Sequence, residues 1–181
     1  LSTNLKELEE SMMHSNWQVR ERAIESAGKT GNRQALAYLN KVIKKYPESS
    51  SSILKAVSAL GFSKGLEIAI RCLVMKEAAI QREALNTINA IVDKRHASKV
   101  RQTIVRMVPK LQATVRDTAK EVLDAITERF GLAKLQIDDD QIFETRLLKI
   151  SENQGKVIAS EEPIAQEPQR LIEEIKEGDH W

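Results

Sequence analysis

Few residues in this chain have types and spacings that suit catalysis: three histidines, one cysteine and one run of aspartates. His14, His96 and His180 are too far apart to show metal-ligand spacing, and we interpret each as a surface or helix-end histidine. An apolar helical pattern surrounds Cys72, which favours a structural thiol over a nucleophile. The run Asp138–Asp140 could attract a cation, but it also suits a helix start, where carboxylates interact favourably with the dipole. The chain has no glycine-rich phosphate loop, nucleophile elbow or HExxH motif. We therefore expect no catalytic residue, no metal site and no bound cofactor.

Positive charge, by contrast, is concentrated in three segments. Residues 32–46, 63–75 and 97–110 contain ten lysine and arginine residues and a single acid, Glu67. A surface of one sign attracts partners of the other sign, so these segments predict a site for an acidic partner. A solvated helix surface is the alternative. The candidate partner-binding residues are Lys41, Lys44, Lys45, Lys64, Arg71, Lys99, Arg101, Arg106 and Lys110. Those expected to be exposed along one side are Lys41, Lys45, Arg71, Lys99, Arg106 and Lys110.

The composition favours a helical protein. The 181 residues are 41% apolar but only 4% aromatic, and they include seven glycines and four prolines. A β-sandwich would need more turns and more aromatic strands. The single cysteine excludes an intrachain disulfide and suggests a reducing compartment such as the cytoplasm. No apolar run approaches the length of a membrane span, and the chain does not start with a signal peptide.

Apolar residues recur at helical spacing along most of the chain. Gly28 and Gly31 are expected to stop the second helix, Pro47 the third and Gly61 the fourth. We interpret Trp17, at the start of the second helix, as a packing residue, with a partner-binding aromatic as the alternative. The expected helices cover residues 5–14, 17–29, 34–46, 50–60, 64–75, 78–94, 98–110, 113–130, 139–150 and 168–176.

A five-residue block recurs four times within these helices. The spacings between successive copies are 33, 28 and 35 residues, which is typical of stacked helical repeats. The copies start at Val19, Ser52, Ile80 and Val115, and each ends in a small residue: Ala23, Ala56, Ala84 and Ala119. A small side chain there would let neighbouring helices approach closely.

The second residue of the block has an open role. Arg20 could reach carbonyls or acids of the adjacent repeat, or it could be a solvated charge. Ile53 and Gln81 occupy the same place in the second and third copies. Any ladder of bonds between repeats is therefore expected to be interrupted.

The block and a following glycine resemble the HEAT repeat family, in particular its short bacterial members, the HEAT-like repeats of chromophore-lyase type. The resemblance covers roughly residues 5–131. It rests on Val19, Arg20, Ala23 and Gly28, and again on Val115, Arg116 and Ala119. The aspartate that often precedes the block is absent, with Asn16 and Ala113 in its place.

The resemblance implies an all-α fold, a right-handed α-solenoid of antiparallel helix pairs. It further implies that the helices with the block line the convex side and that the basic helices line the concave side, where partners dock. Some HEAT-like proteins are chromophore lyases or DNA glycosylases, so the fold alone does not define the activity.

The charge divides the chain into two regions. Residues 1–134, the expected solenoid, carry 23 basic and 14 acidic residues, a net charge of +9. Residues 135–181 carry 5 basic and 12 acidic residues, a net charge of −7. We expect this acidic C-terminal extension to contain helix 139–150, which would cover the apolar face of helix 113–130, then a linker and helix 168–176.

The leading functional hypothesis is a non-catalytic scaffold or adaptor in the cytoplasm. Its basic concave face would receive an acidic protein partner or the chain's own acidic tail. A nucleic-acid-binding protein is the alternative, because phosphates also attract basic stripes. An enzyme of the lyase or glycosylase type is a third possibility.

Overall fold

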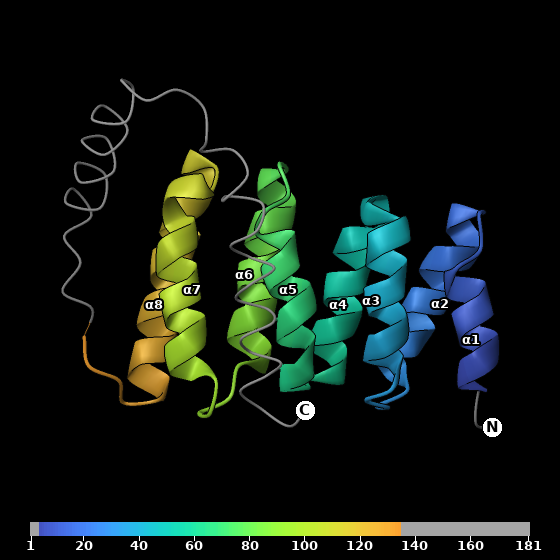
Figure 1. Ribbon diagram of the computed structural model, residues 1–181, viewed down its shortest axis with the longest axis horizontal. Helices are drawn as coiled ribbons and strands as arrows, with labels where there is room; N and C mark the ends of the chain where they lie inside the picture. The colour runs from blue at the N-terminus through green and yellow to red at the C-terminus, as the bar shows by residue number, and fades with distance from the viewer. Residues whose placement is uncertain (1–3, 135–181) are drawn as a thin grey trace, which may run out of the picture.

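A computed structural model describes residues 4–134 of the chain. Within these residues it contains eight α-helices and no strand, so the predicted all-helical class is confirmed there (Figure 1). The helices are α1 Leu5–Met12, α2 Trp17–Lys29, α3 Ala35–Lys45, α4 Ser50–Leu60, α5 Leu66–Cys72, α6 Ala78–Ile91, α7 Ala97–Met107 and α8 Arg116–Arg129. Four 3₁₀ turns join or extend them: η1 Pro47–Ser49, η2 Ser63–Gly65, η3 Val108–Lys110 and η4 Ala113–Val115. The expected helices 139–150 and 168–176 lie outside the described residues.

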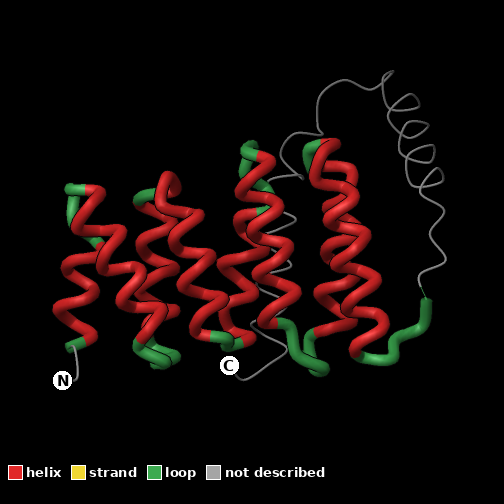
Figure 2. Tube along the Cα trace, turned by 180° about the vertical axis from the view of Figure 1, so that it is seen from behind, coloured by secondary structure: helices red, strands yellow, loops and turns green. Residues whose placement is uncertain are grey.

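The helices stand side by side in chain order and form two layers (Figure 1). The odd-numbered helices α1, α3, α5 and α7 lie in front of the even-numbered helices (Figure 1). The connections between successive helices lie alternately at the upper and the lower edge of the row (Figure 2). The repeated block lies on the even-numbered helices or, at α8, begins in the turn before the helix. In that layer α2 packs against α4, α4 against α6 and α6 against α8. Among the described odd-numbered helices only α1 and α3 pack on each other to more than a marginal extent, and less closely than the even-numbered pairs. The even-numbered layer is therefore the more closely packed one.

Local signals set several helix ends where the sequence predicts them. The Asn4 and Asn16 side chains accept hydrogen bonds from backbone N–H groups in the first turns of α1 and α2. Gly61 ends α4 in the left-handed region, with a φ of 73°. Gly31 has a φ of 62° and follows the end of α2. Asparagine caps thus set the starts of these helices, and glycines in the left-handed region follow their ends.

Gly28 has a different role from the predicted one. It lies inside α2, is buried, and does not stop the helix. A Cβ atom at this position would lie 2.9 Å from the Cα of Ala56 on α4. The glycine and the small residue of the next block therefore let the α2 and α4 backbones approach closely, as the alanine spacing predicts for the array.

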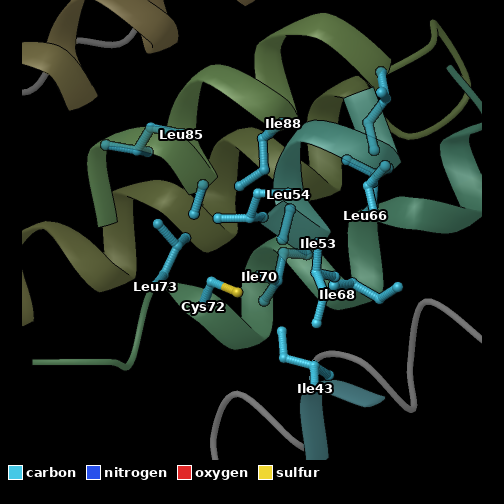
Figure 3. Packing of buried hydrophobic residues seen from close by; sticks show 14 of the residues in the cluster. Ile43, Ile53, Leu54, Leu66, Ile68, Ile70, Cys72, Leu73, Leu85 and Ile88 are labelled. Atoms are coloured by element: carbon cyan, nitrogen blue, oxygen red, sulfur yellow. The ribbon is translucent and has the colours of Figure 1, made fainter. Parts of the chain in front are cut away.

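The core lies between the two layers. Figure 3 shows part of it, where α5 and α6 meet α4 and where Leu54, Ile70 and Leu85 are among the labelled side chains. Most apolar residues of the expected helix faces are buried or partly buried, but two at the start of α2 are exposed. Trp17 is 63% exposed and Val19 is 38% exposed. The interpretation of Trp17 as a packing residue is therefore wrong, because none of the helices α1–α8 covers its indole.

Arg20 joins successive helix pairs. Its guanidinium is 3% exposed and its Nε donates to Ser49 Oγ at 2.9 Å. The same group donates to the carbonyl of His14 at 3.0 Å and forms an ion pair with Glu48 at 3.3 Å. It also stacks 4.0 Å from the centre of the Tyr46 ring. Arg20 is therefore not a solvated charge, since it reaches both carbonyls and an acid.

Gln81 makes the equivalent connection in the third copy of the block. Its Nε2 donates to the carbonyl of Met75 at 2.8 Å, and its Oε1 accepts from the N–H of Gln112 at 2.9 Å. The predicted interruption of the ladder is therefore wrong at this copy. The prediction treated glutamine as a break, but glutamine has both a donor and an acceptor. Ile53, buried in the core, provides no polar link.

Candidate functional site: a basic surface on α3, α5 and α7

The nine candidate residues lie on α3, α5 and α7 or in the 3₁₀ turns beside these helices. We call them the basic surface. The apolar faces of the three helices pack toward the even-numbered layer, so their exposed residues point away from it. Lys41, Lys44, Lys45, Lys99 and Arg106 are exposed, whereas Lys64, Arg71, Arg101 and Lys110 are half-buried. The structure thus brings cations from distant parts of the sequence to one layer.

Helix direction explains why many of these charges lie near one edge of the layer. Successive helices are antiparallel and stand across the row, so α3, α5 and α7 all end at the same edge of the row (Figure 2). Lys44 and Lys45 lie in the last turn of α3, and Arg71 and Arg106 lie in the last turns of α5 and α7. A cation in the last turn interacts favourably with the helix dipole. Local helix stability and a shared basic edge therefore result from the same placement.

The α3 cations differ in what they contact. Lys41 Nζ lies 2.7 Å from Glu9 of α1 and 5.5 Å from the centre of the Tyr38 ring. The hydrogen bond to Glu9 and its charge raise the pKa of Lys41 above its usual value. Lys45 lies 5.2 Å from the centre of the Tyr46 ring. An exposed pair such as Lys41–Glu9 contributes little to stability, so Lys41 remains accessible to a competing acid.

Arg71 does not fit the prediction of an exposed cation. Its side chain is 21% exposed, and its Nη2 lies 3.5 Å from Glu67 on the same helix. Glu67 in turn accepts a hydrogen bond of 3.2 Å from Asn40 of α3. The predicted exposure of Arg71 is therefore wrong, because its side chain lies along its own helix and pairs with Glu67.

Arg101 and Lys110 are also less available than their sequence positions suggest. Arg101 Nη1 donates to Thr127 Oγ1 at 3.1 Å and to the carbonyl of Ala133 at 2.6 Å. It therefore ties α7 to α8 and to the chain that follows α8. Lys110 lies in η3 and is half-buried, which contradicts its expected exposure.

Four cations remain exposed and have no ion pair with another residue of the described part of the chain: Lys44, Lys45, Lys99 and Arg106. We call them the open cations. They lie on α3 and α7, the two helices that flank α5. An ammonium or guanidinium in this setting can bind carboxylates or phosphates without first breaking an internal pair.

Two features cannot be read from the helical pattern alone. Glu9 limits the basic surface at the α1 end, and only its contact with Lys41, 32 positions away, reveals this. Trp17, on α2 in the other layer, is exposed at the first position of its helix. Such a terminal position is a sequence signal that favours exposure over packing.

The residues considered for catalysis have structural surroundings. Cys72 is fully buried, and burial, the largest effect, raises the pKa of its thiol to about 12. His96 lies at a helix end as predicted, but it is buried rather than at the surface, and its Nδ1 lies 2.6 Å from Asp93. His14 is exposed and its Nδ1 accepts from the N–H of Asn16. Between residues 4 and 134 no group of three or more His, Cys, Asp or Glu side chains could hold a metal ion. His180 and Asp138–Asp140 lie outside the described residues.

Comparison of the chain with protein-family models, with curated proteins and with solved structures found no match. None of the helices between residues 4 and 134 is both long and apolar enough to cross a membrane. The arrangement of side chains on the two layers is therefore the basis for a functional proposal.

Proposed function

We propose that this chain is a short HEAT-like α-solenoid that acts as a non-catalytic scaffold or adaptor and binds an acidic protein partner through its basic surface. The observation that carries the proposal is the concentration of positive charge on three neighbouring helices of one layer. The segments that form α3, α5 and α7 hold ten basic residues and one acid, and four cations there are open. A surface region of one sign favours encounter with a partner of the other sign.

The repeated block and the connections between pairs support the solenoid part of the proposal. Arg20 and Gln81 each bond to the next helix pair, as units that stack in a row require. As the HEAT resemblance implies, we propose that the layer of α3, α5 and α7 is the concave side and that the acidic partner docks there.

A nucleic-acid backbone is the second candidate because it would use the same cations. The aromatic side chains beside them favour the protein partner. Tyr38 and Tyr46 are half-buried, and each is already stacked on a cation of its own or a neighbouring helix. Such rings offer little area on which exposed bases could stack. We also propose a reducing compartment such as the cytoplasm, since the only cysteine is buried as a thiol.

Titration with two labelled probes tests the proposal. Poly-glutamate represents an acidic protein segment, and a mixed-sequence DNA duplex represents a phosphate backbone. We expect poly-glutamate to bind and the duplex to bind only feebly at low salt. Duplex binding that is tighter than poly-glutamate binding and falls steeply with salt would favour the nucleic-acid candidate instead.

Charge reversal with a matched control locates the site. The triple variant Lys44→Glu, Lys99→Glu and Arg106→Glu should weaken poly-glutamate binding at least about tenfold, because each open cation contributes to attraction at the surface. The control triple, on the even-numbered layer, is Arg22→Glu, Lys29→Glu and Lys55→Glu, all exposed positions. It makes the same change in net charge. Equal losses in the two triples would show that only net charge matters and would overturn the proposed site.

A further inference from the structure

The connections between helices at the upper edge of the row contact one another (Figure 2). The Tyr46 hydroxyl, at the end of α3, donates to the carbonyl of Met13 at 3.3 Å and links the α3–α4 connection to the α1–α2 connection. The Ser50 hydroxyl oxygen, at the start of α4, lies 3.3 Å from Met75 Sδ and links the same connection to the α5–α6 connection. Side chains therefore hold the first three connections of this edge together.

The fourth connection, between α7 and α8, joins the same series. The Gln112 side chain donates to the carbonyl of Lys76 in the α5–α6 connection at 3.2 Å. We define the ridge as the four connections, residues 13–16, 46–49, 73–77 and 108–115, with the adjoining turns of the helices. A surface whose parts are already held in place loses less freedom when it binds a partner.

The exposed large apolar side chains of residues 4–134 all lie on the ridge. Trp17 and Val19, in the first turn of α2, are 63% and 38% exposed, and Val74, in the α5–α6 connection, is 47% exposed. Exposed apolar residues that are scattered singly over a surface need no explanation, but these three are restricted to one edge of the row. The ridge therefore differs from the rest of the described surface.

Open cations alternate with the apolar residues along the ridge. Lys44 and Lys45 lie at the second connection, between Trp17 at the first and Val74 in the third. Arg106 lies in the last turn of α7, at the fourth connection. A partner that follows the ridge therefore meets apolar and positive groups in turn.

The acids of the four connections do not cancel this charge. Glu48 and Glu77 are the exposed acids there, and Glu48 already pairs with Arg20 at 3.3 Å. Glu77 is balanced by its chain neighbour Lys76, which is exposed as well. The open cations are therefore left to attract a partner.

Charge and apolar contact contribute differently to binding. Exposed charges mainly raise the association rate, whereas affinity comes mainly from buried aromatic and apolar anchors. Tryptophan is enriched among such anchors, because its ring buries a large area and its N–H can still donate. Open cations on the same ridge as an exposed indole therefore fit a partner that carries carboxylates and apolar side chains together.

We propose that the acidic partner binds along the ridge through an amphipathic acidic segment. Its carboxylates pair with Lys44, Lys45 and Arg106, and its apolar side chains cover Trp17 and Val74. The inference rests on the proposed function, because it specifies the chemistry of the same partner. The ridge borders the layer of α3, α5 and α7, so one partner can contact both. A segment with carboxylates alone would leave the indole in water, and an apolar segment would leave the cations without counter-charges.

Two polymers of equal length test this proposal on the full chain. The first is poly-glutamate and the second is a random copolymer of glutamate and tyrosine, both labelled with fluorescein and measured by anisotropy. The copolymer should bind the wild type at least about tenfold more tightly, because tyrosine can cover the exposed apolar side chains. Trp17→Ala with Val74→Ala should remove this advantage and leave poly-glutamate binding unchanged. The control Gln18→Ala, at an exposed position beside Trp17, should bind both polymers as the wild type does.

Indole fluorescence provides a second, local measurement. The chain has two tryptophans, so Trp181→Phe leaves Trp17 as the only one. Its emission should shift to shorter wavelength when the copolymer binds, because the indole then leaves water, and poly-glutamate should cause no shift. An emission that stays unchanged when the copolymer binds would overturn the proposed contact.

The outcomes separate this inference from the proposed function. Equal binding of the two polymers, lost in the Lys44→Glu, Lys99→Glu and Arg106→Glu triple, would keep the acidic-partner site and overturn the apolar contact. A copolymer advantage that survives Trp17→Ala with Val74→Ala would place the aromatic contact elsewhere and would also overturn it. Binding of neither polymer would overturn both proposals.

The same double variant would reveal other occupants of the ridge. Phosphatidylserine vesicles that bind the wild type but not the variant, without a copolymer advantage, would indicate a membrane surface. A concentration-dependent dimer that sedimentation detects in the wild type but not in the variant would indicate a second copy of the chain. Either result would overturn the amphipathic acidic partner.

Discussion

The side-chain Oε1 of Gln81 accepts a hydrogen bond of 2.9 Å from the backbone N–H of Gln112, which lies 31 positions later in the next helix pair. Arg20 holds the same place in its own block and bonds to Ser49 of the next pair. Both side chains are almost fully buried. The connection between pairs therefore persists although the residue type changes, because each side chain satisfies turn carbonyls and still reaches forward.

Replacing Arg20 with methionine should lower the free energy of unfolding by about 2–4 kcal/mol, because buried acceptors lose charge-assisted donors. The acceptors left behind include Ser49 Oγ and the carbonyls of His14 and Ser15. Urea denaturation followed by circular dichroism measures the change. The control Arg22→Met, at an exposed position of the same helix, should change stability by less than about 0.5 kcal/mol. Equal effects at both positions would contradict the role of Arg20 as a link.

A methyl group at Gly28 should force α2 and α4 apart. The added Cβ would lie 2.9 Å from the Cα of Ala56, a backbone atom that can move only with its helix. Gly28→Ala should therefore destabilise the fold by about 1–3 kcal/mol, despite the better helix propensity of alanine. Ser26→Ala, at an exposed position of the same helix, is the control and should be neutral or slightly stabilising. A more stable Gly28→Ala variant in thermal unfolding would refute the close approach.

The Cys72 thiol should resist alkylation in the folded chain. Burial raises its pKa from 9.0 to about 12, so the neutral thiol is favoured by folding. Stability from this group is therefore complete below about pH 9 and decreases as the pH rises toward 12, because the unfolded chain releases the proton first. Iodoacetamide labelling near pH 8 should be slow until urea unfolds the protein. The Cys72→Ala variant should lose less stability than the wild type between about pH 8.5 and pH 10. Rapid labelling of the native chain would argue against a buried structural thiol.

Asp93 should contribute stability that is lost in acid. Burial alone would raise its pKa, but hydrogen bonds from the side chain and backbone of His96, with the charge of His96 and a bond from Ser63, hold the pKa below 3.8. A depressed carboxyl pKa stabilises the folded state above the unfolded value, and the effect disappears as the pH falls through the folded value. Asp93→Asn should therefore destabilise the chain near neutral pH, and the difference from wild type should shrink as the pH falls below about 5. A difference that is constant across this range would show that the charge is unimportant.

The sequence by itself determines the helices and their period. Leu36, Leu39 and Ile43, for example, define one face of α3, and Gly61 ends α4, because helical spacing and left-handed glycine are local properties. The sequence also places ten of its 28 basic residues, with a single acid, in the three segments that form α3, α5 and α7. Local rules did not predict the 3₁₀ turn that opens α5, where the expected helix 64–75 is reduced to Leu66–Cys72.

Only the tertiary structure decides which of these side chains is available. Arg71 and Lys44 both lie in the last turn of a basic helix, yet Arg71 is half-buried and paired with Glu67 while Lys44 is exposed. Trp17 is exposed and Gly28 is a packing contact because of which helix, distant in sequence, lies beside each of them. Exposure and close approach depend on neighbours about 30 residues away in the chain, and the helical period of a single segment carries no information about them.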